Sequence, residues 1–223
     1  MNFIDYADTD MMMLQVARLV SRDLRDALAR RDRVLFAVPG GSTPGPIFDL
    51  LAASDLEWGR IDVIPGDERW VSEDHPRSNA AQIRSRLLRG KAASARLIPL
   101  WRDTPTPEEA MPELVAAISS MLPIDVAIVG MGADMHTASL FPGADNLALA
   151  LSDDAPVVLP ISAPGAAEPR VTLSAPVLRD AYAMHVLITG DDKNMAVHKA
   201  AKMKPIDAPI AALLGDASVH WAP

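Results

Sequence analysis

A histidine and an aspartate stand two residues apart in a glycine-rich segment, Gly130-Met131-Gly132-Ala133-Asp134-Met135-His136. Because an imidazole titrates near neutral pH, His136 is suited to take a proton from water. The Asp134 carboxylate, or a nearby carbonyl, can orient the ring. A lone histidine is more often structural, but glycines on both sides indicate close approach by a ligand. We therefore expect His136 to be a catalytic base and Asp134 to orient it.

A second segment, Pro39-Gly40-Gly41-Ser42-Thr43-Pro44, has the composition of an anion-binding turn. Adjacent glycines let an anion approach the backbone, hydroxyl groups can donate hydrogen bonds, and the helix start that follows offers free N–H groups. We expect a phosphate to bind here, through Gly40, Gly41, Ser42 and Thr43. The glycines alone predict an ordinary strand-to-helix turn equally well. Neither the P-loop nor the dinucleotide-binding motif is present.

Charged side chains in other segments are candidates for the walls of a pocket. Asp67 and Arg69 follow a short apolar run, and Arg77 stands soon after them. Arg170 and Lys193 belong to later segments and supply cations for a phosphate or a carboxylate. Each of these alone is typical of a solvated surface, and the three charges at 67–69 are typical of a solvated loop.

The composition is that of an ordinary globular protein with an acidic balance. The chain has 223 residues, of which 49% are hydrophobic and 22% charged, and we expect one domain over residues 1–223. A net charge of -8 without a basic stripe excludes the nucleic-acid-binding class. The chain has no cysteine, no HExxH pair and no Gly-x-Ser-x-Gly, so we expect neither a metal site nor a serine or cysteine nucleophile.

The sequence also suggests where the protein works. Aspartates and a charged helical pattern fill the first 30 residues, unlike a signal peptide. No apolar run approaches the roughly 20 residues that a membrane span needs. We expect a cytoplasmic protein with a small-molecule partner and no contact with membrane or nucleic acid, as a monomer or weak homodimer.

Apolar runs alternate with helical patterns along most of the chain. We expect strands at 34–38, 61–64, 96–100, 124–129, 157–161, 170–173 and 183–188, and helices at 11–30, 44–51, 78–88 (capped by Ser78), 107–121 and 193–202. Fully apolar strands separated by helices are typical of a parallel sheet covered on both faces. We therefore expect the α/β class, with one open, mixed but mainly parallel sheet, strands that come closer together from 157, and loops at 143–155 and 163–169. Ligands bind such sheets where loops leave the carboxyl ends of the strands.

Six segments, distributed in this order over almost the whole chain, are informative together: PGGSTP, GDERWV, HPRSNA, VGMGADMHTASLFPG, RVTLSAPVL and GDDKNMAV. Together they resemble the 6-phosphogluconolactonase family, which is similar to the glucosamine-6-phosphate deaminases and isomerases. The resemblance implies a Rossmann-like fold, hydrolysis of a phosphosugar lactone in the pentose phosphate pathway, no cofactor, and His136 as the base that activates water. As a hypothesis of mechanism, we expect Asp67 and Arg69 to shape the carbonyl side of the pocket, and Arg77 or backbone N–H groups to donate to the oxyanion.

Two other functions stay open. On the same fold, an aldose-ketose isomerase or amino-sugar deaminase would use Asp67 to shuttle a proton. In deaminases a glutamate stands five residues after the histidine, where this chain has Phe141. The protein could also be a non-catalytic sugar-phosphate sensor, because Met135 stands where the family usually has glycine. If that position needs a positive φ, Met135 carries a strain of about 1 kcal/mol.

Overall fold

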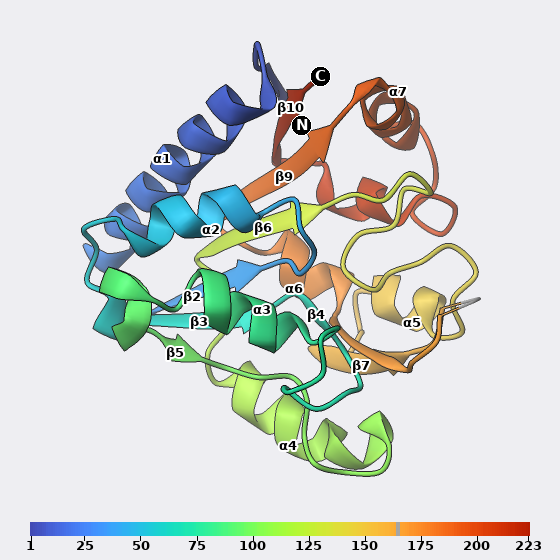
Figure 1. The fold of residues 1–223 in the computed structure, drawn as a ribbon. Helices are drawn as coiled ribbons and strands as arrows, with labels where there is room; N and C mark the ends of the chain where they lie inside the picture. The colour runs from blue at the N-terminus through green and yellow to red at the C-terminus, as the bar shows by residue number, and fades with distance from the viewer. Residues whose placement is uncertain (164–165) are drawn as a thin grey trace.

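The computed structural model of the protein describes residues 1–163 and 166–223. Seven strands form one sheet in the order β1-β10-β9-β6-β2-β3-β5, with every neighbouring pair parallel and helices on both sides (Figure 1). The strands are β1 Asn2–Asp5, β2 Val34–Val38, β3 Ile61–Pro65, β5 Arg96–Leu97, β6 Val126–Gly130, β9 Ala183–Thr189 and β10 Ser218–Ala222. The expected α/β class with a mainly parallel sheet is confirmed.

A second, smaller sheet is antiparallel and has the order β4-β8-β7. Its strands are β4 Asp67–Arg69, β7 Val158–Ile161 and β8 Arg170–Leu173. The expectation of one mixed sheet was wrong, because the antiparallel pairs lie in this separate sheet. The segment 162–169 is shorter than the crossover of about a dozen residues that parallel neighbours need, so β7 and β8 pair antiparallel with each other.

The longer helices lie close to their expected positions. The α-helices are α1 Thr9–Leu28, α2 Gly45–Ala52, α3 Asn79–Arg86, α4 Pro107–Ser119, α5 Leu147–Leu151, α6 Ala175–Arg179 and α7 Asp191–Ala200, and the 3-10 helices are η1 Trp58–Arg60, η2 Gly90–Ser94 and η3 Pro209–Leu213. Ser78 caps α3 as expected, since its side chain accepts a hydrogen bond from the backbone of Ala81. Within the described residues, no helix has the length and apolar character needed to cross a membrane.

Some elements were not predicted. The helix α5 falls inside 143–155, where we expected only a loop, and β1, β10 and α6 were not recognised. The expected loop at 163–169 is described only in part, because 164 and 165 lie outside the described residues.

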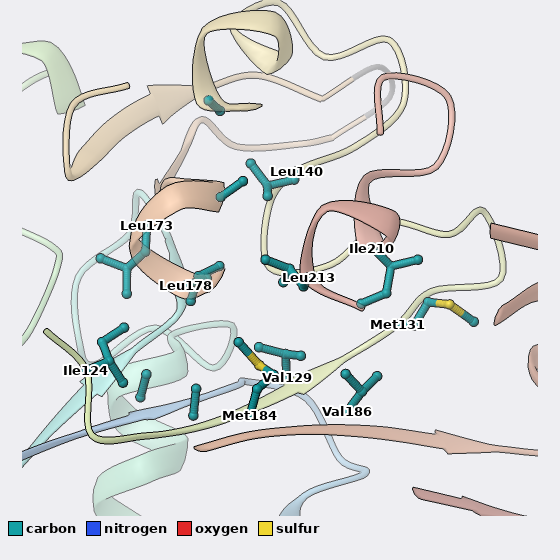
Figure 2. Packing of buried hydrophobic residues seen from close by; sticks show 14 of the residues in the cluster. Ile124, Val129, Met131, Leu140, Leu173, Leu178, Met184, Val186, Ile210 and Leu213 are labelled. Carbon is teal, nitrogen blue, oxygen red and sulfur yellow. The ribbon is translucent and has the colours of Figure 1, made fainter. Parts of the chain in front are cut away.

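Alternate side chains of the central strands enter two different hydrophobic cores. In β2, Leu35 and Ala37 join a cluster that includes residues of α4, α6 and α7. Val34 and Phe36 join a second cluster that includes residues of α1, α2 and α3. Figure 2 shows part of the first cluster, where strands of the main sheet pack against α6 and η3. Since both faces of the sheet are covered, its two central strands β2 and β6 carry no polar side chain.

The strand order reverses between β2 and β6. From β2 the chain continues to β3 and β5 on one side, and from β6 to β9 and β10 on the other. In sheets of this kind a crevice forms at such a reversal, outside the carboxyl ends of the strands. The glycine turn follows β2 and the histidine segment follows β6, so the topology brings these two segments to one place.

A chain of hydrogen bonds joins α1 to the last two strands. The Oδ2 atom of Asp23 lies 2.9 Å from Nε2 of His185. The two histidines meet at 3.0 Å, between His185 Nδ1 and His220 Nε2, and His220 Nδ1 lies 2.8 Å from the Tyr6 hydroxyl. Burial and the nearby His185 lower the pKa of His220 to about 3, although Asp23 opposes them. His220 is therefore neutral in the folded protein at neutral pH.

We predict that the free energy of unfolding decreases as the pH falls from about 6.5 towards 3. The pKa of His220 is 6.5 in the unfolded chain and about 3 in the fold. In this window the unfolded state binds more protons, so the contribution of neutral His220 is complete above the window and is lost as the pH falls. The slope from this residue is at most about 1.4 kcal/mol per pH unit. Urea unfolding at several pH values should show a weaker pH dependence for His220→Gln than for the wild type; equal slopes would contradict the prediction.

Candidate active site

A cavity of about 270 Å³ lies where the chain leaves β2, β6 and β9. Most of the predicted site residues line it, namely Gly40, Gly41, Thr43, Asp67, Arg69, His136, Arg170 and Lys193. Three predicted residues do not. Asp134 contacts His136, Ser42 is exposed, and Arg77 forms an ion pair with Glu168 at 3.0 Å.

His136 and Asp134 form the pair that their spacing suggested. Nδ1 of His136 lies 2.5 Å from Oδ1 of Asp134, which also accepts a hydrogen bond of 3.2 Å from the His136 backbone. Burial alone would raise the pKa of Asp134, but the hydrogen bond and charge of His136 outweigh it and hold the pKa below its ordinary value. Because a carboxylate only accepts hydrogen bonds, we assign the proton to Nδ1, which leaves the lone pair of Nε2 free.

The core fixes the segment that carries this pair. Met131 and Leu140, at its two ends, are buried in the cluster that Figure 2 shows. Between them, Gly132 donates its N–H to the carbonyl of His136 at 3.0 Å. Met135 has φ 67°, so the position does require the left-handed conformation in which a side chain costs about 1 kcal/mol.

An aromatic ring lies against the catalytic candidate. The rings of Phe141 and His136 stack, with centroids 4.2 Å apart and planes inclined by 30°. The guanidinium of Arg170 also faces Phe141, with Cζ 5.2 Å from the ring centroid. Phe141 thus touches both the imidazole and a cation of the cavity.

The second sheet places Asp67 in the cavity wall. Its Oδ2 accepts a hydrogen bond of 2.5 Å from the hydroxyl of Ser139 and lies 3.7 Å from Nη1 of Arg170. Its Oδ1 accepts a hydrogen bond of 3.2 Å from the amide of Asn79. Asp67 is therefore held by the histidine segment, by β8 and by α3.

Glu68 is an anchor that the sequence analysis missed. We treated 67–69 as typical of a solvated loop, but the three residues form β4 and Glu68 is fully buried. Its carboxylate accepts hydrogen bonds of 2.8 Å from the backbone N–H groups of Arg69, Asn79 and Ala80. Burial raises the pKa of Glu68, while these hydrogen bonds act in the opposite direction. The only sign of this role in the sequence is that Glu68 stands shortly before a predicted helix, whose N-terminus favours a negative charge.

The glycine turn is held by side chains of α3. Gly40 packs against Asn79, because a Cβ at Gly40 would lie 1.9 Å from Asn79 Oδ1. The N–H of Gly41 donates to Oε1 of Gln82 at 2.9 Å, and Nε2 of Gln82 donates to the Gly41 carbonyl. This pairing engages the N–H of Gly41, so that group is not free to donate to an anion.

The cavity has a positive charge balance in an acidic protein. Arg69, Arg170 and Lys193 line it together with one acidic side chain, Asp67. The Nε atoms of both arginines are buried and have no hydrogen-bond partner within the part of the chain that the structure describes. Burial lowers the pKa of Arg170 against the opposing effect of Asp67, but an arginine stays protonated at neutral pH. Such a site suits an anionic ligand.

The described residues contain no group of three or more His, Cys, Asp or Glu side chains arranged to hold a metal ion.

Comparison with known proteins identifies the family. Residues 7–221 match the family model described as glucosamine-6-phosphate isomerases/6-phosphogluconolactonase. The chain belongs to this family. The 6-phosphogluconolactonase of Mesorhizobium japonicum is 37% identical in an alignment 227 residues long that covers 100% of this chain and 95% of the relative. That of Pseudomonas aeruginosa is 38% identical in an alignment 215 residues long that covers 93% of this chain and 89% of the relative.

The fold agrees with solved structures of the family. The crystal structure of a 6-phosphogluconolactonase from Shewanella baltica matches with a TM-score of 0.95 at 28% identity, over 100% of this chain and 97% of that chain. The six segments that carry the resemblance in the sequence supply most of the residues that line the cavity.

We predict that Gly132→Ala displaces the histidine and aspartate without unfolding the protein. A Cβ at Gly132 would lie 2.2 Å from Nδ1 and Cε1 of His136 and 2.6 Å from Oδ1 of Asp134, so the side chains must move. We expect a loss of about 1 to 3 kcal/mol in the free energy of unfolding. Among the five histidines, the imidazole NMR signals of His136 should shift most.

The matched control for this variant is Gly59→Ala, because a Cβ at Gly59 would meet nothing within 4 Å. The control should change neither stability nor the His136 signals. Unchanged signals of His136 in Gly132→Ala would contradict the packing described here.

Proposed function

We propose that the protein hydrolyses 6-phospho-D-glucono-1,5-lactone to 6-phospho-D-gluconate, in the oxidative pentose phosphate pathway, with His136 as the general base. The observation that carries the proposal is the His136–Asp134 pair at the edge of a cavity with three cationic side chains. The relatives from M. japonicum and P. aeruginosa carry the name 6-phosphogluconolactonase and support the same substrate.

The chemistry needs one base. His136 takes a proton at Nε2 from the water that attacks the lactone carbonyl, and it then protonates the ring oxygen as the ester bond breaks. Asp134 keeps the other proton on Nδ1 and stabilises the imidazolium. Because a δ-lactone is an activated ester, a base worth about 10²- to 10⁴-fold plus correct positioning is sufficient.

The two ends of the substrate meet different parts of the cavity. We place the phosphate against the glycine turn, Arg170 and Lys193, and the lactone carbonyl near His136. Asp67 and Arg69 shape the cavity beside the carbonyl. Arg77 is a weaker candidate for the oxyanion, since it pairs with Glu168 and does not line the cavity. Backbone N–H groups are therefore the oxyanion donors that we favour.

The structure bears on both alternatives. In an isomerase or deaminase a glutamate five residues after the histidine would help to tune it, whereas here that position is Phe141, whose uncharged ring stacks on His136. A sensor was considered because Met135 replaces a glycine, but Met135 adopts the left-handed conformation and the pair with Asp134 is formed. We therefore favour the lactonase. A cytoplasmic location, one domain over 1–223 and a monomeric or weakly dimeric state complete the proposal.

We predict that His136→Ala lowers kcat for 6-phosphogluconolactone by about 10²-fold or more while the fold survives. The assay couples product formation to a dehydrogenase, and the spontaneous hydrolysis of fresh substrate is subtracted. His198→Ala is the matched control, because His198 is exposed on α7 and its ring contacts Phe3 in a tilted arrangement outside the cavity. Near-wild-type turnover by folded His136→Ala would rule out the mechanism.

We also predict that Arg170→Ala and Lys193→Ala chiefly raise KM for the phosphorylated lactone. Each lost charge-assisted hydrogen bond should cost about 1.5 to 3 kcal/mol in binding. The unphosphorylated gluconolactone should hardly be affected, because it lacks the group that these cations bind. Lys199→Ala, which changes an exposed lysine of the same helix α7, is the control. Equal losses with both substrates would mean that the substrate lies in another orientation.

A further inference from the structure

Asn79 lies between the two parts of the cavity and is not explained by the mechanism above. It is the first residue of α3, is 2% exposed and lines the cavity. Its side-chain nitrogen donates hydrogen bonds to the backbone carbonyl of Asp67, at 2.8 Å, and to Asp67 Oδ1, at 3.2 Å. Both partners can only accept, so the amide orientation is fixed, with the nitrogen towards Asp67.

The amide oxygen of Asn79 faces the glycine turn. A Cβ at Gly40 would lie 1.9 Å from this oxygen, so the turn approaches it as closely as a residue without a side chain can. One planar amide therefore separates the carboxylate of Asp67 from the backbone of Gly40 by a fixed distance. These are the parts of the cavity that we assigned to the carbonyl end and to the phosphate end of the substrate.

Asn79 is itself firmly held. Its backbone N–H donates to Oε1 of Glu68 at 2.8 Å, which fixes the start of α3 to β4. Within the described residues, Oδ1 of Asp67 accepts a side-chain hydrogen bond from Asn79 alone, since the contacts of Ser139 and Arg170 are to Oδ2. Asn79 at Oδ1 and Ser139 at Oδ2 thus together fix the rotation of the Asp67 carboxylate.

We infer that Asn79 is a positioning residue for lactone hydrolysis, which acts by fixing the Asp67 carboxylate relative to the glycine turn. The inference rests on the proposed function. If Asp67 lies beside the reacting carbonyl, its displacement weakens contacts that matter most in the transition state, so kcat falls for any lactone with the same ring. A residue that only supported the phosphate site would instead affect KM for the phosphorylated substrate.

The test uses Asn79→Asp and Asn79→Ala. Asn79→Asp keeps the size of the side chain but replaces the donor by a second carboxylate, so that two like charges share one proton. We expect kcat to fall by about 10-fold or more for both 6-phosphogluconolactone and gluconolactone, and the acid limb of the pH profile to move to higher pH. Asn79→Ala should lower kcat similarly without that movement of the acid limb.

The matched control is Asn146→Asp, which removes an amide donor outside the cavity. Nδ2 of Asn146 donates to the carbonyl of Pro160 at 3.0 Å, and this variant should keep the wild-type kcat and pH profile. Thermal unfolding of each variant, with assays well below its Tm, separates loss of function from loss of fold. If either variant does not fold, Asn79→Ser takes its place in the test. The serine hydroxyl keeps a hydrogen-bond donor on a shorter side chain, so Asn79→Ser should retain more activity than Asn79→Ala.

The outcomes separate the two proposals. Absence of lactonase activity in the wild type would defeat the proposed function. Wild-type activity with unchanged kcat in the folded Asn79 variants would overturn the positioning role alone. A rise of KM confined to the phosphorylated lactone would also overturn it, because Asn79 would then act only through the glycine turn.

Discussion

The buried carboxylate of Glu68 joins the two sheets of the protein through one helix. Removing a carboxylate from water costs several kcal/mol unless hydrogen bonds compensate, and here three backbone N–H groups do so. Two of them belong to the first turn of α3, where N–H groups have no partner within the helix. Glu68 therefore satisfies the start of α3 and at the same time fixes β4. From this junction α3 presents Asn79 and Gln82 to the glycine turn, and β4 presents Asp67 and Arg69 to the cavity.

Features that depend on a local sequence pattern could be predicted from the sequence. The central strands are apolar because both faces are covered, and the catalytic candidates stand at strand ends, so both could be predicted. Glu68 could not, because its charge suggests solvent and its two partners in α3 lie 11 and 12 residues further along the chain. Strand β10, between β1 and β9, contains Ser218 and His220, whose polarity hid it; the buried His220 forms hydrogen bonds with Tyr6 and His185. The antiparallel sheet was missed because β4 has three residues and no apolar pattern.

The charge of the cavity runs against that of the whole protein. A net charge of -8 repels an anionic substrate at long range, but screening limits this repulsion to about 10 Å at ordinary salt. Near the cavity, Arg69, Arg170 and Lys193 dominate, and the buried position of Arg170 strengthens its attraction to an anion. Asp67 pairs loosely with Arg170, at 3.7 Å, so it does not fully neutralise the cation.

The histidine segment shows how the core takes part in the site. Met135 and Ala138 have φ of 67° and 49°, conformations that cost each side chain about 1 kcal/mol. Contacts between this segment and the rest of the protein offset the cost. Leu140 is buried in the core, and the carbonyl of Met135 accepts a hydrogen bond of 3.1 Å from Ile210 of η3. Since the backbone is fixed by these contacts, a glycine at 135 is not required, and His136 keeps its hydrogen bond to Asp134 with a methionine between them.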